Sequence, residues 1–163
     1  MAEIGKKPSD PPTLIREATH LDAALRALVR VHRARDRQRA LRYDLVLSHY
    51  HALLALTRMG PLTVTALGEH LHLEKSTASR VAKGLLGQGL VRKRSPSSDD
   101  RKVILQVTEL GMRLSRRIQN DLSEEYLELL SNLEPGSRDD LPGVLTELAR
   151  RLETSGISTA GPE

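Results

Sequence analysis

The chain has 163 residues, and 39% of them are apolar, but it contains no Phe, no Trp and only three Tyr. This length favours a single domain with an aliphatic core, and the net charge of +4 is compatible with a polyanionic partner such as a nucleic acid. The absence of cysteine excludes disulfides, thiolate metal sites and thiol-based redox sensing. We expect a cytoplasmic protein, because no apolar stretch follows Lys6 and Lys7 and the longest apolar run, Ala52–Leu56, is too short to cross a membrane.

A flexible tail is expected over residues 1–13, whose end, Pro11-Pro12-Thr13, marks a helix start. A long N-terminal helix is expected over residues 14–42, where apolar residues recur every three or four positions. The end of this helix is crowded with arginines, and only Asp36 opposes them. The helix dipole explains one or two cations at a C-terminus, but not six. They are Arg30, Arg33, Arg35, Arg37, Arg39 and Arg42.

The central segment, residues 43–108, predicts a winged helix-turn-helix. Its first helix is expected over 46–58, with Asp44 as a cap and Met59-Gly60-Pro61 as its end. A short helix, Val64–Leu71, follows the N-cap residue Thr63, and a second one runs from about Glu74 to Gly87.

Two β-rich segments, Leu90–Lys93 and Val103–Val107, come next and are joined by the polar loop Arg94–Lys102. This arrangement indicates a β-hairpin, or wing. The fold class is therefore mainly α with a small β-hairpin.

The helix from Glu74 to Gly87 has two different faces. Ala78, Val81, Ala82 and Leu85 form an apolar stripe that is expected to pack inward. The opposite face offers hydroxyls and cations, which suit phosphates and base edges in a major groove: Ser76, Thr77, Ser79, Arg80 and Lys83. A solvated surface helix can look the same, but charge is segregated along the chain. Residues 74–102 hold eight Lys or Arg against three acids, whereas the chain after Thr108 holds eleven acids against six Arg. This pattern favours nucleic-acid binding.

Two C-terminal helices are expected within residues 109–153, before a second flexible tail over 154–163. Thr108 is expected to cap the first of them, and Pro142 is expected in the first turn of the second, which should begin at Arg138. The terminal helices have apolar stripes and no strands to cover them. We therefore expect residues 14–42 and 109–153 to be dimerisation helices that interlock with a second copy of the chain.

Three motifs resemble the multiple-antibiotic-resistance regulator (MarR) family of bacterial and archaeal winged-helix transcription factors. They are Glu74-Lys-Ser-Thr-Ala-Ser-Arg-Val-Ala-Lys-Gly-Leu, then Gly89-Leu-Val-Arg-Lys, and then Asp100-Arg-Lys-Val-Ile-Leu-Gln-Val-Thr-Glu-Leu-Gly111. The resemblance covers residues 44–111 clearly and the flanking helices in pattern only. Glu74 stands where the family often has Ser or Asp, and Ser97 and Ser98 stand where it has its first wing acid.

The resemblance implies an intertwined homodimer that binds a pseudo-palindromic site in double-stranded DNA, most often as a repressor. It also implies a small phenolic or carboxylate effector, a wing that uses Asp100 and Arg101, and no cofactor. Arg94 and Lys102 are further DNA-binding candidates on the wing. The arginine-rich helix end then has three interpretations: it pairs with the acids Glu124, Glu125 and Glu128, which we favour, it touches phosphates, or it lines an effector site.

Other classes of function have weaker signals. His49 and His51 are two residues apart, as are His70 and His72, so neither pair shares a helix face as a preformed metal site does. His20, His32 and His49 could still meet across a dimer, and a zinc-responsive regulator is the second hypothesis. A winged-helix module that binds protein is the third. The sequence has no Gly-x-Ser-x-Gly or His-Glu-x-x-His motif, and we expect no enzyme and no catalytic residue.

Overall fold

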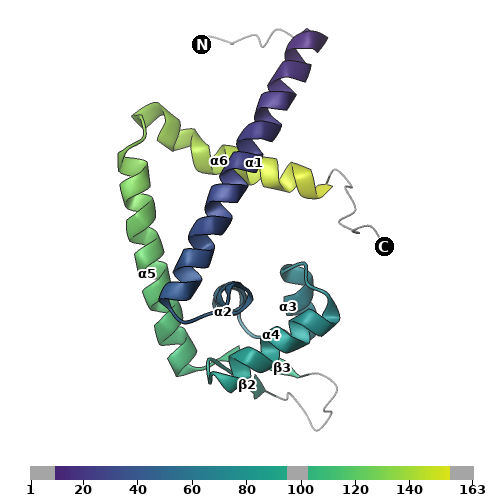
Figure 1. Cartoon of the computed structure of the whole chain (residues 1–163), viewed down its shortest axis with the longest axis vertical. Helices are drawn as coiled ribbons and strands as arrows, with labels where there is room; N and C mark the ends of the chain where they lie inside the picture. Colours follow the sequence, from purple (N-terminus) through teal and green to yellow (C-terminus); the bar gives the residue numbers. More distant parts are fainter. Residues whose placement is uncertain (1–9, 95–102, 155–163) are drawn as a thin grey trace, which may run out of the picture. The chain divides into compact units, whose positions relative to one another are not determined.

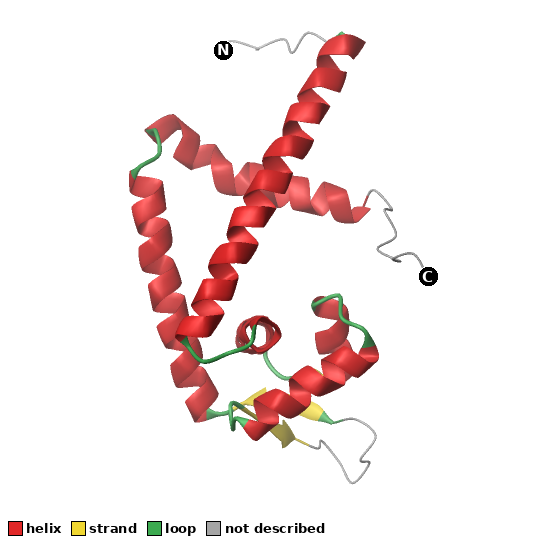
Figure 2. Ribbon diagram, viewed as in Figure 1, coloured by secondary structure: helices red, strands yellow, loops and turns green. Residues whose placement is uncertain are grey.

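The computed structural model describes residues 10–94 and 103–154 (Figure 1). The elements follow in the order α1 (Pro11–Arg42), α2 (Leu47–Met59), β1 (Leu62–Thr63), α3 (Val64–His70), α4 (Lys75–Gly87), β2 (Val91–Arg94), β3 (Ile104–Val107), α5 (Glu109–Ser131) and α6 (Pro135–Thr154). The chain forms two compact units, residues 1–115 and 116–163. The described part is mostly helical with one small antiparallel sheet, which confirms the predicted fold class (Figure 2). No helix within it is long and apolar enough to span a membrane.

The sheet has three strands in the order β1-β3-β2. Strands β2 and β3 form the expected hairpin, in which Val91 pairs with Val107 and Arg94 pairs with Ile104. Strand β1 was not predicted, because two residues are too short to show the alternation by which a strand is recognised. It pairs Leu62 with Leu105 and so ties the start of α3 to the hairpin.

The core of the first unit lies where α2 meets α3, α4 and the sheet. Most of its fully buried side chains are aliphatic, as expected, and they include Leu53, Leu56, Leu67, Leu85, Val91 and Leu105. Tyr50 and Ser115 are also fully buried. Burying a leucine or valine side chain stabilises the fold by roughly 1.5–3 kcal/mol. Leu85 lies in this core, and it therefore anchors α4 to the unit.

Two predicted helix caps are confirmed and one is wrong. Thr63 Oγ1 accepts a hydrogen bond from the Ala66 N–H at 3.1 Å, and Thr108 Oγ1 accepts one from the Gly111 N–H at 3.1 Å. Asp44 does not cap α2, because its backbone takes a left-handed conformation with φ +54°. The N-cap residue of α2 is Val46, which makes no side-chain cap bond.

The ends of the terminal helices also differ from expectation. Helix α1 begins at Pro11 rather than at residue 14. Helix α6 begins at Pro135, so Pro142 lies inside the helix and not in its first turn. A proline at the first helical position loses no backbone hydrogen bond, which makes Pro135 a better start than Arg138.

Candidate nucleic-acid interface

Helix α4 is fixed by its apolar stripe. Ala78, Val81, Ala82 and Leu85 are each at most 3% exposed, which confirms the inward face predicted for them. The crossing with α3 is close, since a Cβ at Gly68 would lie 3.0 Å from the Ala78 Cβ. Because one face is locked in this way, the opposite face of α4 has a defined orientation toward solvent.

The outer face of α4 carries the hydroxyls and cations picked out from the sequence. Ser76, Arg80 and Lys83 are exposed, and Thr77 and Ser79 are half-buried. The Arg80 Nη2 group donates a hydrogen bond to Thr77 Oγ1 at 3.1 Å, one turn earlier. This bond orients a planar guanidinium group whose other N–H groups can donate to a phosphate or a guanine edge.

The hairpin adds a second group of cations. Arg94 ends β2 and is exposed, as are its neighbours Arg92 and Lys93. Arg92 Nε and Nη2 donate to Gln106 Oε1 on β3 at 3.2 and 3.0 Å, and these residues line a shallow hollow on the sheet surface. The sequence-based list of candidates omitted Arg92 and Lys93, although three consecutive cations at 92–94 were a visible signal. Three other candidates, Asp100, Arg101 and Lys102, lie outside the described residues.

The base of the hairpin is joined tightly to the start of α5. Thr108 Oγ1 lies 2.7 Å from the carbonyl oxygen of Gly89 and 3.2 Å from that of Leu90, so its hydroxyl donates there. At Gly111 the backbones approach so closely that a Cβ would overlap the Leu90 carbonyl oxygen. Only glycine fits at that position without movement of the backbone.

Arg39, in the arginine-rich helix end, pairs with Asp36 on the same helix. Arg39 and Asp36 are both buried, and Arg39 Nη1 donates to Asp36 Oδ1 at 2.8 Å. Nε2 of His32 and Nε2 of His51 lie 3.5 and 3.6 Å from Asp36 Oδ2. The proposed pairing of the other arginines with Glu124, Glu125 and Glu128 stays a prediction.

A metal site has no support in residues 10–94 and 103–154. Within these ranges, no group of three or more His, Asp or Glu side chains could hold an ion. His49 and His51 face different elements, α4 and α1 respectively. The zinc hypothesis therefore gains nothing from the geometry.

Two helices joined by a tight turn, with one apolar and one cationic face on the second helix and an antiparallel hairpin after it, define a winged helix-turn-helix of the DNA-binding class.

The MarR family model matches residues 45–104. The chain is 30% identical over 105 residues to the organic hydroperoxide resistance transcriptional regulator of Bacillus subtilis (strain 168). This aligned segment covers 64% of this chain and 68% of that protein. A MarR family protein from Bacillus stearothermophilus has a similar structure, with TM-score 0.75, 21% identity and coverage of 85% of this chain and 96% of that one. The overoxidized AbfR protein, solved bound to DNA, gives a TM-score of 0.64 at 23% identity, with 88% and 98% coverage. This chain belongs to the MarR family and is a DNA-binding transcriptional regulator.

Proposed function

We propose that this regulator is a homodimeric repressor that binds a pseudo-palindromic operator and is released by a small effector. The observation that carries the proposal is helix α4, whose buried stripe fixes a cationic, hydroxyl-bearing face toward solvent. In the proposed complex, one α4 of each protomer enters the major groove, and the half-site centres lie about one helical turn, ~10 bp, apart.

The residues of α4 take different roles in this proposal. Arg80 reads a guanine, because its planar fork matches the two acceptors on the guanine edge. Lys83 lies almost one turn further along and meets a phosphate as a point charge. The hydroxyl groups of Ser76, Thr77 and Ser79 form hydrogen bonds with phosphates or bases.

The wing is proposed to enter the minor groove. Arg101 would lie in a narrow A/T-rich tract, where the negative potential is strong. Asp100 cannot favour a phosphate, so its role would be to hold a nearby arginine or backbone amide and fix the loop. Arg94 and Lys102 would contact the phosphates beside the groove. Asp100→Ala should then weaken binding, whereas simple electrostatics predicts that removal of an acid strengthens it.

The surface of the single chain supports a homodimer. No residue of α1 before Asp36 is buried, although isolated helices gain most of their stability from tertiary packing. Exposed apolar side chains lie along α1, and they are Leu14, Ile15, Leu21, Leu28, Val29, Val31 and Leu41.

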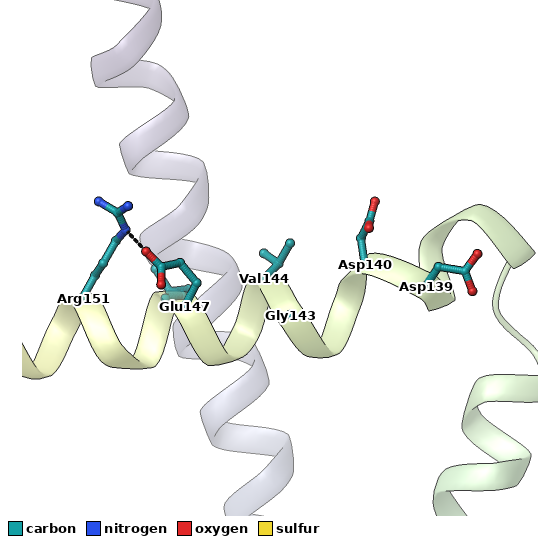
Figure 3. Close-up of a pocket in the computed structure, with 7 residues that line it drawn as sticks. Asp139, Asp140, Gly143, Val144, Glu147 and Arg151 are labelled. Atoms are coloured by element: carbon teal, nitrogen blue, oxygen red, sulfur yellow. Dashed lines mark hydrogen bonds and ion pairs between the residues drawn. The ribbon is translucent and has the colours of Figure 1, made fainter.

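Helix α6 has no buried residue either. One of its faces presents Asp140, Val144, Glu147 and Arg151, with Arg151 paired to Glu147 (Figure 3). Val144 is 60% exposed on that face. A second copy of the chain would cover Val144 and the other exposed apolar side chains of α6, which are Leu141, Leu145 and Leu152, as the family resemblance implies.

The effector is proposed to be a small phenolic or carboxylate compound that binds best to a dimer with a different spacing of its two winged units. Such a ligand weakens DNA binding by the difference between its affinities for the two states. The B. subtilis relative is named for organic hydroperoxide resistance, but this chain has no cysteine and cannot sense a peroxide through a thiol.

The experiment that tests the proposal compares Arg80→Ala with Lys83→Ala on a selected operator and on random DNA. Arg80→Ala should cost ~1–3 kcal/mol on the operator and relax the preference at one base pair per half-site. Lys83→Ala should weaken binding to the operator and to random DNA by similar factors. It should also make the affinity less dependent on salt concentration. Equal losses on both DNAs for Arg80→Ala would show that Arg80 contacts only phosphate.

Sedimentation at micromolar protein tests the assembly. A monomer that retains full operator binding would contradict the homodimer.

A further inference from the structure

The side chain of His49 on α2 lies directly against Gly84 on α4. An ideal Cβ at position 84 would overlap Cε1 and Nε2 of the His49 ring. Glycine inside a helix is unfavourable relative to alanine, so this residue needs a packing reason. The ring supplies that reason, because it occupies the space that any other residue at position 84 would fill.

The His49 ring acts there as a neutral, space-filling group. Its Nδ1 atom is buried and has no hydrogen-bond partner among the residues that the structure describes. Burial lowers the pKa of His49, because the charged imidazolium would lose its hydration. A residue whose polar atom is left unsatisfied contributes through its shape and position rather than through a bond.

The place of contact on α4 is next to the residues proposed to meet DNA. Gly84 directly follows Lys83 and lies four residues after Arg80, one turn along the same side of the helix. A shift of the helix at Gly84 therefore moves both side chains. The buried stripe holds the adjacent side of α4, and the ring limits how far the helix can tilt toward α2.

We propose that His49 is a positioning residue for DNA recognition, whose ring on Gly84 sets the tilt at which α4 presents Arg80 and Lys83. This inference rests on α4 being the recognition helix, as proposed above. Neither residue touches DNA in this account. The contact acts on sequence discrimination, because a base edge demands more exact placement than a phosphate does.

Helix α2 also connects this contact to α1. His51, two residues after His49, places its Nε2 atom 3.6 Å from Asp36 Oδ2 on α1. One histidine of α2 thus faces α1 and the other faces α4. A movement of α1 relative to the winged unit would reach the recognition helix through α2 and the His49 ring.

The test uses a cycle of His49→Ala, Gly84→Ala and the double variant, measured by fluorescence anisotropy on operator and random DNA. His49→Ala removes the ring, and Gly84→Ala displaces it. Each single change should reduce operator affinity about tenfold, the size of one misplaced base contact, with a smaller loss on random DNA. The loss of operator affinity in the double variant should be smaller than the product of the two single losses, because the new methyl group fills space that the ring has left. His49→Phe, which keeps a neutral ring, should retain most of the operator preference.

Circular dichroism at the assay temperature ensures that only folded variants are compared, and if Gly84→Ala does not fold, His49→Ala and His49→Phe still decide the question. Operator affinity unchanged by His49→Ala would overturn the proposal. Equal losses on the two DNAs, or losses that multiply in the double variant, would overturn it as well. Arg80→Ala is measured beside them: if it also leaves operator binding unchanged, the assignment of α4 as recognition helix has failed, and not only the role of His49.

Discussion

The buried ion pair of Asp36 and Arg39 permits a test with a matched control on the same helix. The test replaces Asp36 by Asn, which has the same shape but no charge. The control replaces Asp22 by Asn. Asp22 accepts a hydrogen bond from Arg26 at 2.8 Å, the same length as the Arg39–Asp36 bond.

The two pairs differ in burial, and this difference sets the expected magnitude. The side chains of Asp36 and Arg39 are 9% and 5% exposed, whereas those of Asp22 and Arg26 are 60% and 77% exposed. Removing one partner of a buried pair costs ~3–5 kcal/mol, because a buried charge loses its compensation. Asparagine can still accept one bond from Arg39, so we expect a loss of ~3 kcal/mol, a large part of a typical total of 5–15 kcal/mol. For a chain of this size that lowers the melting temperature by roughly 6–12 °C.

The assay is urea denaturation followed by circular dichroism, at one protomer concentration for all three proteins. Asp36→Asn should unfold at a clearly lower urea concentration, and Asp22→Asn should match the unchanged protein, because water screens an exposed pair. Equal midpoints for the two variants would refute the reasoning that burial determines the contribution of these pairs.

Three further outcomes are expected. Gly111→Ala should lose at least ~1–3 kcal/mol of stability in thermal unfolding, because its methyl group meets the backbone oxygen of Leu90, whereas Gly87→Ala, with open space around it, should lose none. The lowered pKa of His49 means that the unfolded chain takes up a proton near the ordinary pKa of 6.5 while the folded protein resists it. The free energy of unfolding should therefore decrease as the pH falls below about 6.5. In His49→Phe, which has no group to titrate at this position, the free energy of unfolding should change less over the same pH range. Arg101→Ala should weaken operator binding without loss of fold, and the effect should shrink when the A/T pairs that flank the half-sites become G/C.

The features that could be predicted are those that depend on neighbours along the chain. The stripe of Ala78, Val81, Ala82 and Leu85 follows the helical repeat, and all four are buried. Thr63 and Thr108 cap the helices that begin directly after them, since the bonds span only three residues.

The features that were missed depend on conformation or on distant segments. Asp44 has a good capping side chain, but its left-handed backbone places it before the true N-cap. Strand β1 exists only because β3 pairs with it. The contact of His49 with Gly84 joins two helices, so the sequence offered six histidines and no reason to select this one.

The lack of buried residues in α1 before Asp36 has a consequence for how the regulator responds to its own concentration. Before Asp36 this helix buries no side chain within its own chain, so in the proposed homodimer its stability would come from the second copy. Folding of the helix would then be linked to association, and the melting temperature would rise with protein concentration. At low expression, operator occupancy would fall with the square of the monomer concentration. Operator occupancy would therefore respond steeply to the amount of this regulator, even in the absence of an effector.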